Sequence, residues 1–249
     1  MADRTLLVLD IETVPDRSLW SPEMEKQAQR KDDGRGREDP FPPPWAHQVL
    51  VAGVLWLGPD HSFRKLGLVG QGTTDEERIL RDMGKFLDEH HPVLVTYNGR
   101  RFDLPVLALR SMRHGIPAAW YFHRGNAYRQ RYRSDAHVDL CEELSDHGSV
   151  RRPKLDDAVR LIGLPGKLGV DGSWVDSMAA RGDIAAVQKY CLTDVVQTAF
   201  LYLRYLVLRG DLDPARFRDL ARALRDALAS ADATTELFAR TDWGRYVME

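Results

Sequence analysis

The stretch that decides the fold is Leu6-Leu-Val-Leu-Asp-Ile-Glu-Thr13, near the start of the sequence. Its aliphatic run predicts a buried β-strand over residues 5–11. Because alternate residues of a strand face the same side, Asp10 and Glu12 share one face. Carboxylates among buried aliphatic residues are costly unless they are paired or bind a metal. A solvated strand edge is the alternative, but we expect this pair to bind a divalent cation such as Mg²⁺ or Mn²⁺, which prefers oxygen ligands.

A third carboxylate, Asp103, follows the next buried strand, which we predict over residues 92–97. Asn98 and Gly99 allow the backbone to turn sharply at the end of that strand, and a helix is predicted over residues 103–113. Asp103 then lies at the carboxyl edge of the sheet, where the sites of open α/β sheets are found. Taken alone, an acid in the first turn of a helix also complements the helix dipole, so this interpretation depends on the other carboxylates.

The fourth carboxylate, Asp194, lies on a long helix that begins after Gly182-Asp183 and that we predict to reach about Leu208. Tyr190 precedes Asp194 by four residues, so the two side chains share a helix face. A phenol next to a metal-bound carboxylate can orient or deprotonate an attacking water. The alternative is a core tyrosine beside a surface acid.

The remaining elements indicate the architecture. Strands predicted at 48–57 and 62–69 flank the hairpin signal Gly58-Pro-Asp60, and a capping box of Thr74 and Glu77 begins a helix that ends near His90. Further predicted elements are a short strand at 137–140, short helices at 155–161 and 173–180, and one or two helices within 213–242. This order predicts an α/β fold: a mixed sheet flanked by helices, with a helical C-terminal extension. The absence of a glycine-rich turn after the first strand counts against a Rossmann dinucleotide fold.

Composition limits the partners and the compartment. The chain has 249 residues, a net charge of −2 and a pI near 6.5, so any nucleic-acid contact must come from a local basic patch. Its two cysteines, Cys141 and Cys191, exclude a disulfide framework and fit a reducing cytosol. No uncharged run approaches a transmembrane length, and the N-terminus lacks the pattern of a signal peptide. We therefore expect a cytoplasmic protein without a membrane partner.

One local basic patch is visible, at residues 121–133. Its arginines alternate with four aromatic residues and no acid; they are Arg124, Arg129, Arg131 and Arg133. Strips of this kind hold phosphates and stack bases, so we predict that this one binds a single strand of nucleic acid. A salt-bridged surface loop is the competing interpretation.

Taken in order, the motifs Asp10-x-Glu12, Asn98-Gly-x-x-Phe-Asp103 and Tyr190-x-x-x-Asp194 resemble those of the tyrosine subclass of the DEDD superfamily. Its members are ribonuclease H-like 3′→5′ exonucleases. The rest of the chain is most similar to bacterial stand-alone proteins related to the proofreading exonuclease domain of family B DNA polymerases. The segments that carry this similarity are His137-Val-Asp-Leu140, Leu155-Asp-Asp157, Gly163-Leu-Pro-Gly-Lys167, Val170-Asp-Gly-Ser173 and Tyr190-Cys-Leu-Thr-Asp194. The similarity covers about residues 5–208, and the tail after Gly210 lies outside it.

The resemblance implies an organisation, a site and an activity. Residues 1–210 would form the exonuclease domain, with residues 211–249 as a helical extension of the same domain. The implied ligands of two Mg²⁺ or Mn²⁺ ions are Asp10, Glu12, Asp103 and Asp194. The other implied site residues are Tyr190, which would position the attacking water, and Asn98 and Phe102, which would lie near the terminal nucleotide. The implied reaction is 3′→5′ hydrolysis of single-stranded DNA; an exoribonuclease of the same fold and a catalytically silent nucleic-acid-binding module are the alternatives.

Overall fold

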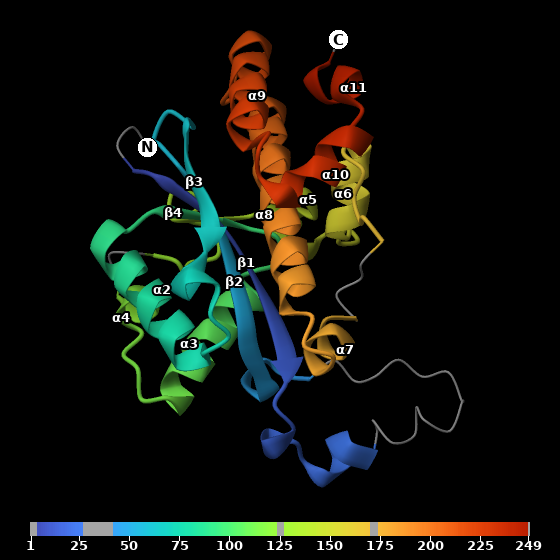
Figure 1. Cartoon of the computed structure of the whole chain (residues 1–249). Coiled ribbons are helices and arrows are strands. Elements are labelled where there is room, and N and C mark those ends of the chain that lie inside the picture. Colours follow the sequence, from blue (N-terminus) through green and yellow to red (C-terminus); the bar gives the residue numbers. More distant parts are fainter. Residues whose placement is uncertain (1–3, 27–41, 124–126, 170–173, 249) are drawn as a thin grey trace.

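The protein is described from a computed structural model that covers residues 4–26, 42–123, 127–169 and 174–248 (Figure 1). Within these residues a single sheet has the strand order β3-β2-β1-β4-β5. β1 pairs antiparallel with β2 and parallel with β4, so the predicted mixed sheet is confirmed. The strands are β1 (Leu6–Pro15), β2 (His47–Leu57), β3 (Phe63–Leu68), β4 (Val93–Thr96) and β5 (His137–Asp139).

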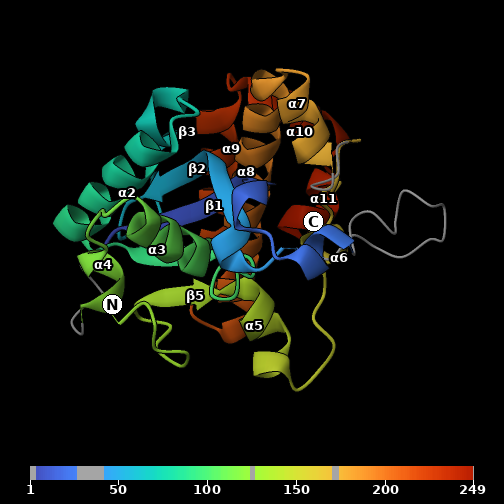
Figure 2. The ribbon, with the colours of Figure 1, turned by 90° about the horizontal axis from the view of Figure 1, so that it is seen from below.

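Helices cover both faces of the sheet (Figures 1 and 2). One face packs against a core that includes Leu7 and Leu9 of β1. The helices on that side are α2 (Glu76–His90), α3 (Asp103–Arg113) and α4 (Ala119–Phe122). The opposite face, which includes Leu6 and Val8, packs against a second core that the long helix Ile184–Arg209 shares. The helices on this side are α5 (Leu140–Leu144), α6 (Leu155–Leu161), α7 (Val175–Ala180), α8 (Ile184–Arg209), α9 (Pro214–Leu228), α10 (Asp232–Arg240) and α11 (Trp243–Val247).

Helix α8 crosses β1 and β2 and forms the centre of the second layer (Figure 1). Among the described residues, α8 is long and apolar enough to span a membrane when only length and composition are considered. However, 72% of its most apolar window is buried within the protein. Core helices of globular domains pass the same test. The packing of α8 against the sheet explains why this helix is apolar on most of its surface.

The C-terminal tail joins the same core. Side chains of α9, α10 and α11 belong to the cluster that also contains Phe200 of α8; they include Phe217, Leu220, Leu237 and Tyr246. The Tyr246 hydroxyl donates a hydrogen bond to the backbone oxygen of Phe200 at 2.9 Å. The predicted boundary at residue 210 coincides with the end of α8, and the division of the chain there stays a prediction.

Some predicted details are wrong. The N-cap of α2 is Asp75 rather than Thr74, because the Asp75 carboxylate accepts from the Arg78 backbone at 3.3 Å and its charge suits the positive end of the helix. Glu77, expected in the capping box, pairs with Arg81 instead. The first strand runs on to Pro15, because β2 pairs with it along its whole length. The short helices α4 and α5 were not predicted, since four or five residues show no helical period.

Candidate active site

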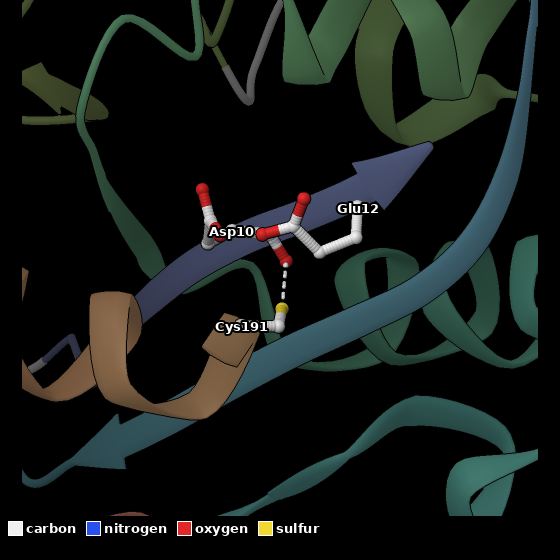
Figure 3. Close-up of side chains that lie close together, drawn as sticks. All are labelled: Asp10, Glu12 and Cys191. Atoms are coloured by element: carbon white, nitrogen blue, oxygen red, sulfur yellow. Dashed lines mark hydrogen bonds between the residues drawn. The ribbon is translucent and has the colours of Figure 1, made fainter. Parts of the chain in front are cut away.

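Asp10 and Glu12 project from the same face of β1, towards α8, as the strand alternation predicts (Figure 3). Ligand atoms of Asp10, Glu12 and Cys191 of α8 lie within 4.8 Å of one another. Burial raises the pKa of the Cys191 thiol well above its usual range, so the sulfur stays neutral. A hard divalent cation prefers oxygen, and the two carboxylates are therefore the ligands that this group offers it.

A tight turn after β4 brings the second motif to β1. Asn98 has a φ of 65°, and a Cβ on Gly99 would lie 2.5 Å from the Thr96 side chain, so only glycine fits there. The buried Asp139 carboxylate accepts hydrogen bonds from the backbone of Asn98 and of Arg100, both at 2.9 Å. Asp139, which belongs to the segment His137-Val-Asp-Leu140, thus stabilises this turn.

Asp103, the first residue of α3, is held against β1 by that turn. Its carboxylate accepts a hydrogen bond from the backbone amide of Ile11 at 3.1 Å. Ile11 lies between Asp10 and Glu12, so the third carboxylate is placed beside the first two. The predicted position of Asp103 at the carboxyl edge of the sheet is confirmed.

The third motif comes from α8. The Asp194 carboxylate acts on the Tyr190 hydroxyl and helps to raise its pKa, so the two side chains share a helix face, as predicted. The buried Gln197 amide donates to Asp194 at 3.4 Å and accepts from the backbone of Gly166 at 3.0 Å. Gln197 therefore joins Asp194 to the turn that contains Gly163-Leu-Pro-Gly-Lys167. Sequence reasoning did not identify Gln197; its spacing of three from Asp194 was the available signal.

Burial disfavours the charge of all four carboxylates, and Asp103 and Asp194 also act on Asp10 and Glu12. Burial, followed by the charges of Glu12, Asp103 and Asp194, raises the pKa of Asp10 well above its usual value. Burial, then Asp194 and Asp103, likewise raises the pKa of Glu12. Burial raises the pKa of Asp103 to about 7 and that of Asp194 to about 7. The structure thus brings Asp103 and Asp194 close enough to act on both Asp10 and Glu12, and the role of the four carboxylates as metal ligands stays a prediction.

A cleft of about 490 Å³ lies over Asp10 and Asp194. Tyr97 and Asn98 line it from the end of β4, so one predicted substrate residue lies in the cleft. Three cationic residues that were not predicted as site residues also line it: Arg101, Arg152 and Lys154. The signals were present, since Arg101 belongs to the second motif and the other two to the basic run Arg151-Arg-Pro-Lys154.

Phe102, also predicted near the terminal nucleotide, is half-buried at the start of α3. Its ring meets that of His47 edge-on, with the centroids 4.9 Å apart. Phe102 packs against the core cluster of α2 and α3. Its contact with a nucleotide stays a prediction.

The basic-aromatic strip is held largely by other protein groups. Arg131 pairs with Glu142 at 3.0 Å, and Arg133 with Asp135 at 2.7 Å. The Arg129 guanidinium lies over the rings of Tyr121 and Phe122, at 5.5 and 4.8 Å from their centroids. Arg124 lies outside the described residues, as does the Val170–Ser173 segment. The three described arginines do not line the cleft, and their role in substrate binding stays a prediction.

Comparison with known proteins gives the family. Residues 39–247 match the model of a family described as predicted 3′-5′ exonuclease related to the exonuclease domain of PolB. The chain belongs to this family. The resemblance seen in the sequence is thereby confirmed, but its expected end near residue 208 is wrong, because the match includes the C-terminal helices. Asp10 and Glu12 precede the matched range, and only the fold places them beside the matched Asp103 and Asp194.

A solved structure supports the fold of this PolB-related exonuclease family member. The chain is similar to the family B DNA polymerase from the hyperthermophilic archaeon Pyrobaculum calidifontis, with a TM-score of 0.53 and 21% sequence identity. The similarity covers 82% of this chain and 24% of the polymerase chain. The predicted ribonuclease H-like fold is confirmed. No curated protein matches the chain.

Proposed function

We propose that the protein is a metal-dependent 3′→5′ exonuclease that hydrolyses the terminal phosphodiester bond of single-stranded DNA. The observation that carries this proposal is the convergence of four carboxylates from β1, α3 and α8 beside a tyrosine. Membership of the exonuclease family supports the reaction class. The cleft over the carboxylates supports a nucleic-acid substrate, because its cationic residues offer partners for backbone phosphates.

The residues fit divalent cations. Asp103 and Asp194 raise the pKa of Asp10 and of Glu12, so positive charge placed among these carboxylates stabilises their ionised forms. Asp10, Glu12, Asp103 and Asp194 would hold two Mg²⁺ or Mn²⁺ ions, since these hard cations take carboxylate oxygens. Such ions supply the positive charge that stabilises the transition state of phosphodiester hydrolysis.

Tyr190 has a separate role. Burial, and then the charge of Asp194, raises its pKa well above that of a free phenol, so the hydroxyl keeps its proton. Of the two roles considered for it, orienting the attacking water fits better than deprotonating it. The charges of Asp194, Glu12 and Asp10 all act on this hydroxyl, which therefore lies next to the carboxylates.

Nuclease assays with substrates of different ends test the proposal. A 5′-labelled DNA single strand should shorten one nucleotide at a time with Mg²⁺ or Mn²⁺ and stay intact with EDTA. A circular single strand of equal length should survive, because it has no 3′ end. A matched RNA strand separates the exoribonuclease alternative, and Asp194→Asn controls for a contaminating nuclease. Intact linear DNA and RNA under every metal condition would contradict the proposal and favour a silent binding module.

A further inference from the structure

Glu142, in the short helix α5, gathers three arginines beside the candidate active site. Its side chain is 4% exposed and lies 3.2 Å from Arg100, 3.0 Å from Arg131 and 3.4 Å from Arg152. The neighbouring Asp139 carboxylate also acts on Arg100. Three guanidinium groups therefore face two carboxylates, and the cluster keeps an excess of positive charge. Because Glu142 has three arginine partners, its carboxylate stays paired even if one of the arginines binds another group.

Arg152 is the member of this cluster that also lines the cleft over Asp10 and Asp194. One of its terminal nitrogens, Nη2, contacts Glu142. The other, Nη1, is buried and has no hydrogen-bond partner among the described residues. A buried donor without a partner costs free energy, and the Arg152 side chain as a whole is 24% exposed, so a small turn of the guanidinium would let it bind an acceptor on a ligand in the cleft favourably.

The backbone around Arg152 is fixed by the sheet. The Tyr97 hydroxyl, at the end of β4, donates a hydrogen bond to the carbonyl of Pro153 at 2.8 Å. This contact ties the segment to the same strand end that carries Asn98 and positions Asp103. Arg152 and Lys154 consequently stand at a defined place in the cleft, with Arg101 also lining it.

We infer that Arg152, assisted by Arg101 and Lys154, forms a phosphate-binding subsite for the internucleotide phosphate on the 5′ side of the scissile bond. The inference rests on the proposed function, because that function places the scissile phosphate at the carboxylates. The carboxylates repel a polyanion, so the rest of the strand requires cations along its path from the cleft. A guanidinium suits this task, since it is always charged and donates two parallel hydrogen bonds to one phosphate.

Two substrates isolate the subsite. A thymidine oligonucleotide carries the neighbouring phosphate, whereas thymidine 5′-monophosphate p-nitrophenyl ester has only the scissile phosphate. Arg152→Ala should lower kcat/KM for the oligonucleotide about 10-fold, through KM, because a charge-assisted contact is lost. Its kcat/KM for the nitrophenyl ester should stay within about 2-fold of the unaltered protein. Arg152→Lys keeps the charge but lacks the planar guanidinium. Its kcat/KM for the oligonucleotide should lie between the values of Arg152→Ala and of the unaltered protein.

Binding without turnover gives the second readout. In EDTA, the slope of log affinity against log salt for a DNA single strand should flatten by about 0.7 in Arg152→Ala, the value for one phosphate contact. Arg225→Ala is the matched control, because Arg225 pairs with Asp226 on α9 and lies outside the cleft. Thermal denaturation of each variant shows whether the fold stays stable without the contact between Arg152 and Glu142. If Arg152→Ala is unfolded, the binding measurement is made with Arg152→Lys.

The outcomes separate the two ideas. Equal losses on both substrates, or an unchanged salt slope, would show that Arg152 only supports the fold and would overturn the inference. Failure of the unaltered protein to hydrolyse either substrate would contradict the proposed function instead. In that case a flatter salt slope in Arg152→Ala than in the unaltered protein would still establish the phosphate contact.

Discussion

Gly53 of β2 lies directly against Cys191 of α8. A Cβ built on Gly53 would stand 2.8 Å from the Cys191 sulfur and 3.2 Å from a methyl group of Val195. Gly53 is also the partner of Asp10 in the β1–β2 pairing. The missing side chain thus lets α8 approach the sheet at the point where Asp10 meets the helix that carries Tyr190 and Asp194.

Gly53→Ala should push α8 away from the sheet. We expect a loss of roughly 1 to 3 kcal/mol in the free energy of unfolding, the usual cost of overpacking a buried contact, and a lower kcat. Adding Cys191→Ala to Gly53→Ala should restore part of both, because the sulfur is the nearest obstacle. Denaturant unfolding and steady-state kinetics measure this coupling in four proteins, namely the unaltered protein, Gly53→Ala, Cys191→Ala and the double variant. Additive effects of the two changes would show that the contact does not control the spacing.

Asp103→Asn should abolish turnover and stabilise the metal-free protein. The amide oxygen can still accept from Ile11, whereas the charge that the site disfavours is gone. With its pKa raised from about 4 to about 7, Asp103 binds its proton more tightly in the folded state, so its contribution to stability falls as pH rises from about 4 to about 7. At pH 8 the gain should approach roughly 4 kcal/mol at most.

Thermal denaturation from pH 5 to pH 8 in EDTA checks this linkage. The variant should lose less stability than the unaltered protein as the pH rises, and Mg²⁺ should stabilise the unaltered protein more at pH 8 than at pH 5, since the ligands are then ionised. Asp219→Asn removes an exposed carboxylate of α9 and is the control. Parallel pH profiles for Asp103→Asn and the unaltered protein would argue against a repelled carboxylate.

Tyr190→Phe should slow catalysis by roughly 100-fold with little change in KM, because the ring stays in place and only the hydroxyl is lost. Single-turnover hydrolysis at saturating substrate measures the chemical step directly. Tyr202→Phe, further along the same helix, makes the identical change in the core and should leave the rate unaltered. A higher KM with an unchanged rate would mark Tyr190 as a binding residue instead.

Arg129→Ala tests the basic-aromatic strip. Among the described arginines of the strip, Arg131 and Arg133 pair with carboxylates. The Arg129 guanidinium lies over an aromatic ring instead. If the strip holds the strand, the salt slope of single-strand binding should flatten by about 0.7 in this variant. Arg78→Ala, on the outer surface of α2, is the matched control. Equal slopes in all three proteins would identify the strip as a salt-bridged surface loop.

The sequence by itself determined the local geometry of the site. Strand alternation placed Asp10 and Glu12 on one face, a turn signal placed Asp103 at the end of a strand, and helical spacing paired Tyr190 with Asp194. These relationships could be predicted because each depends on the repeat of one element or on one short turn. The same reasoning predicted the mixed sheet, since strand and helix signals alternate along the chain.

Only the tertiary structure decided how these parts meet. The contact of Gly53 with Cys191, the hydrogen bonds from the 98–100 backbone to Asp139, and the place of Arg152 in the cleft join residues from about 10 to more than 130 positions apart. It also paired Arg131 with Glu142, which composition alone could not show. Such contacts arise from the close packing of whole elements. A local sequence pattern does not predict which distant side chain will pack at a given position.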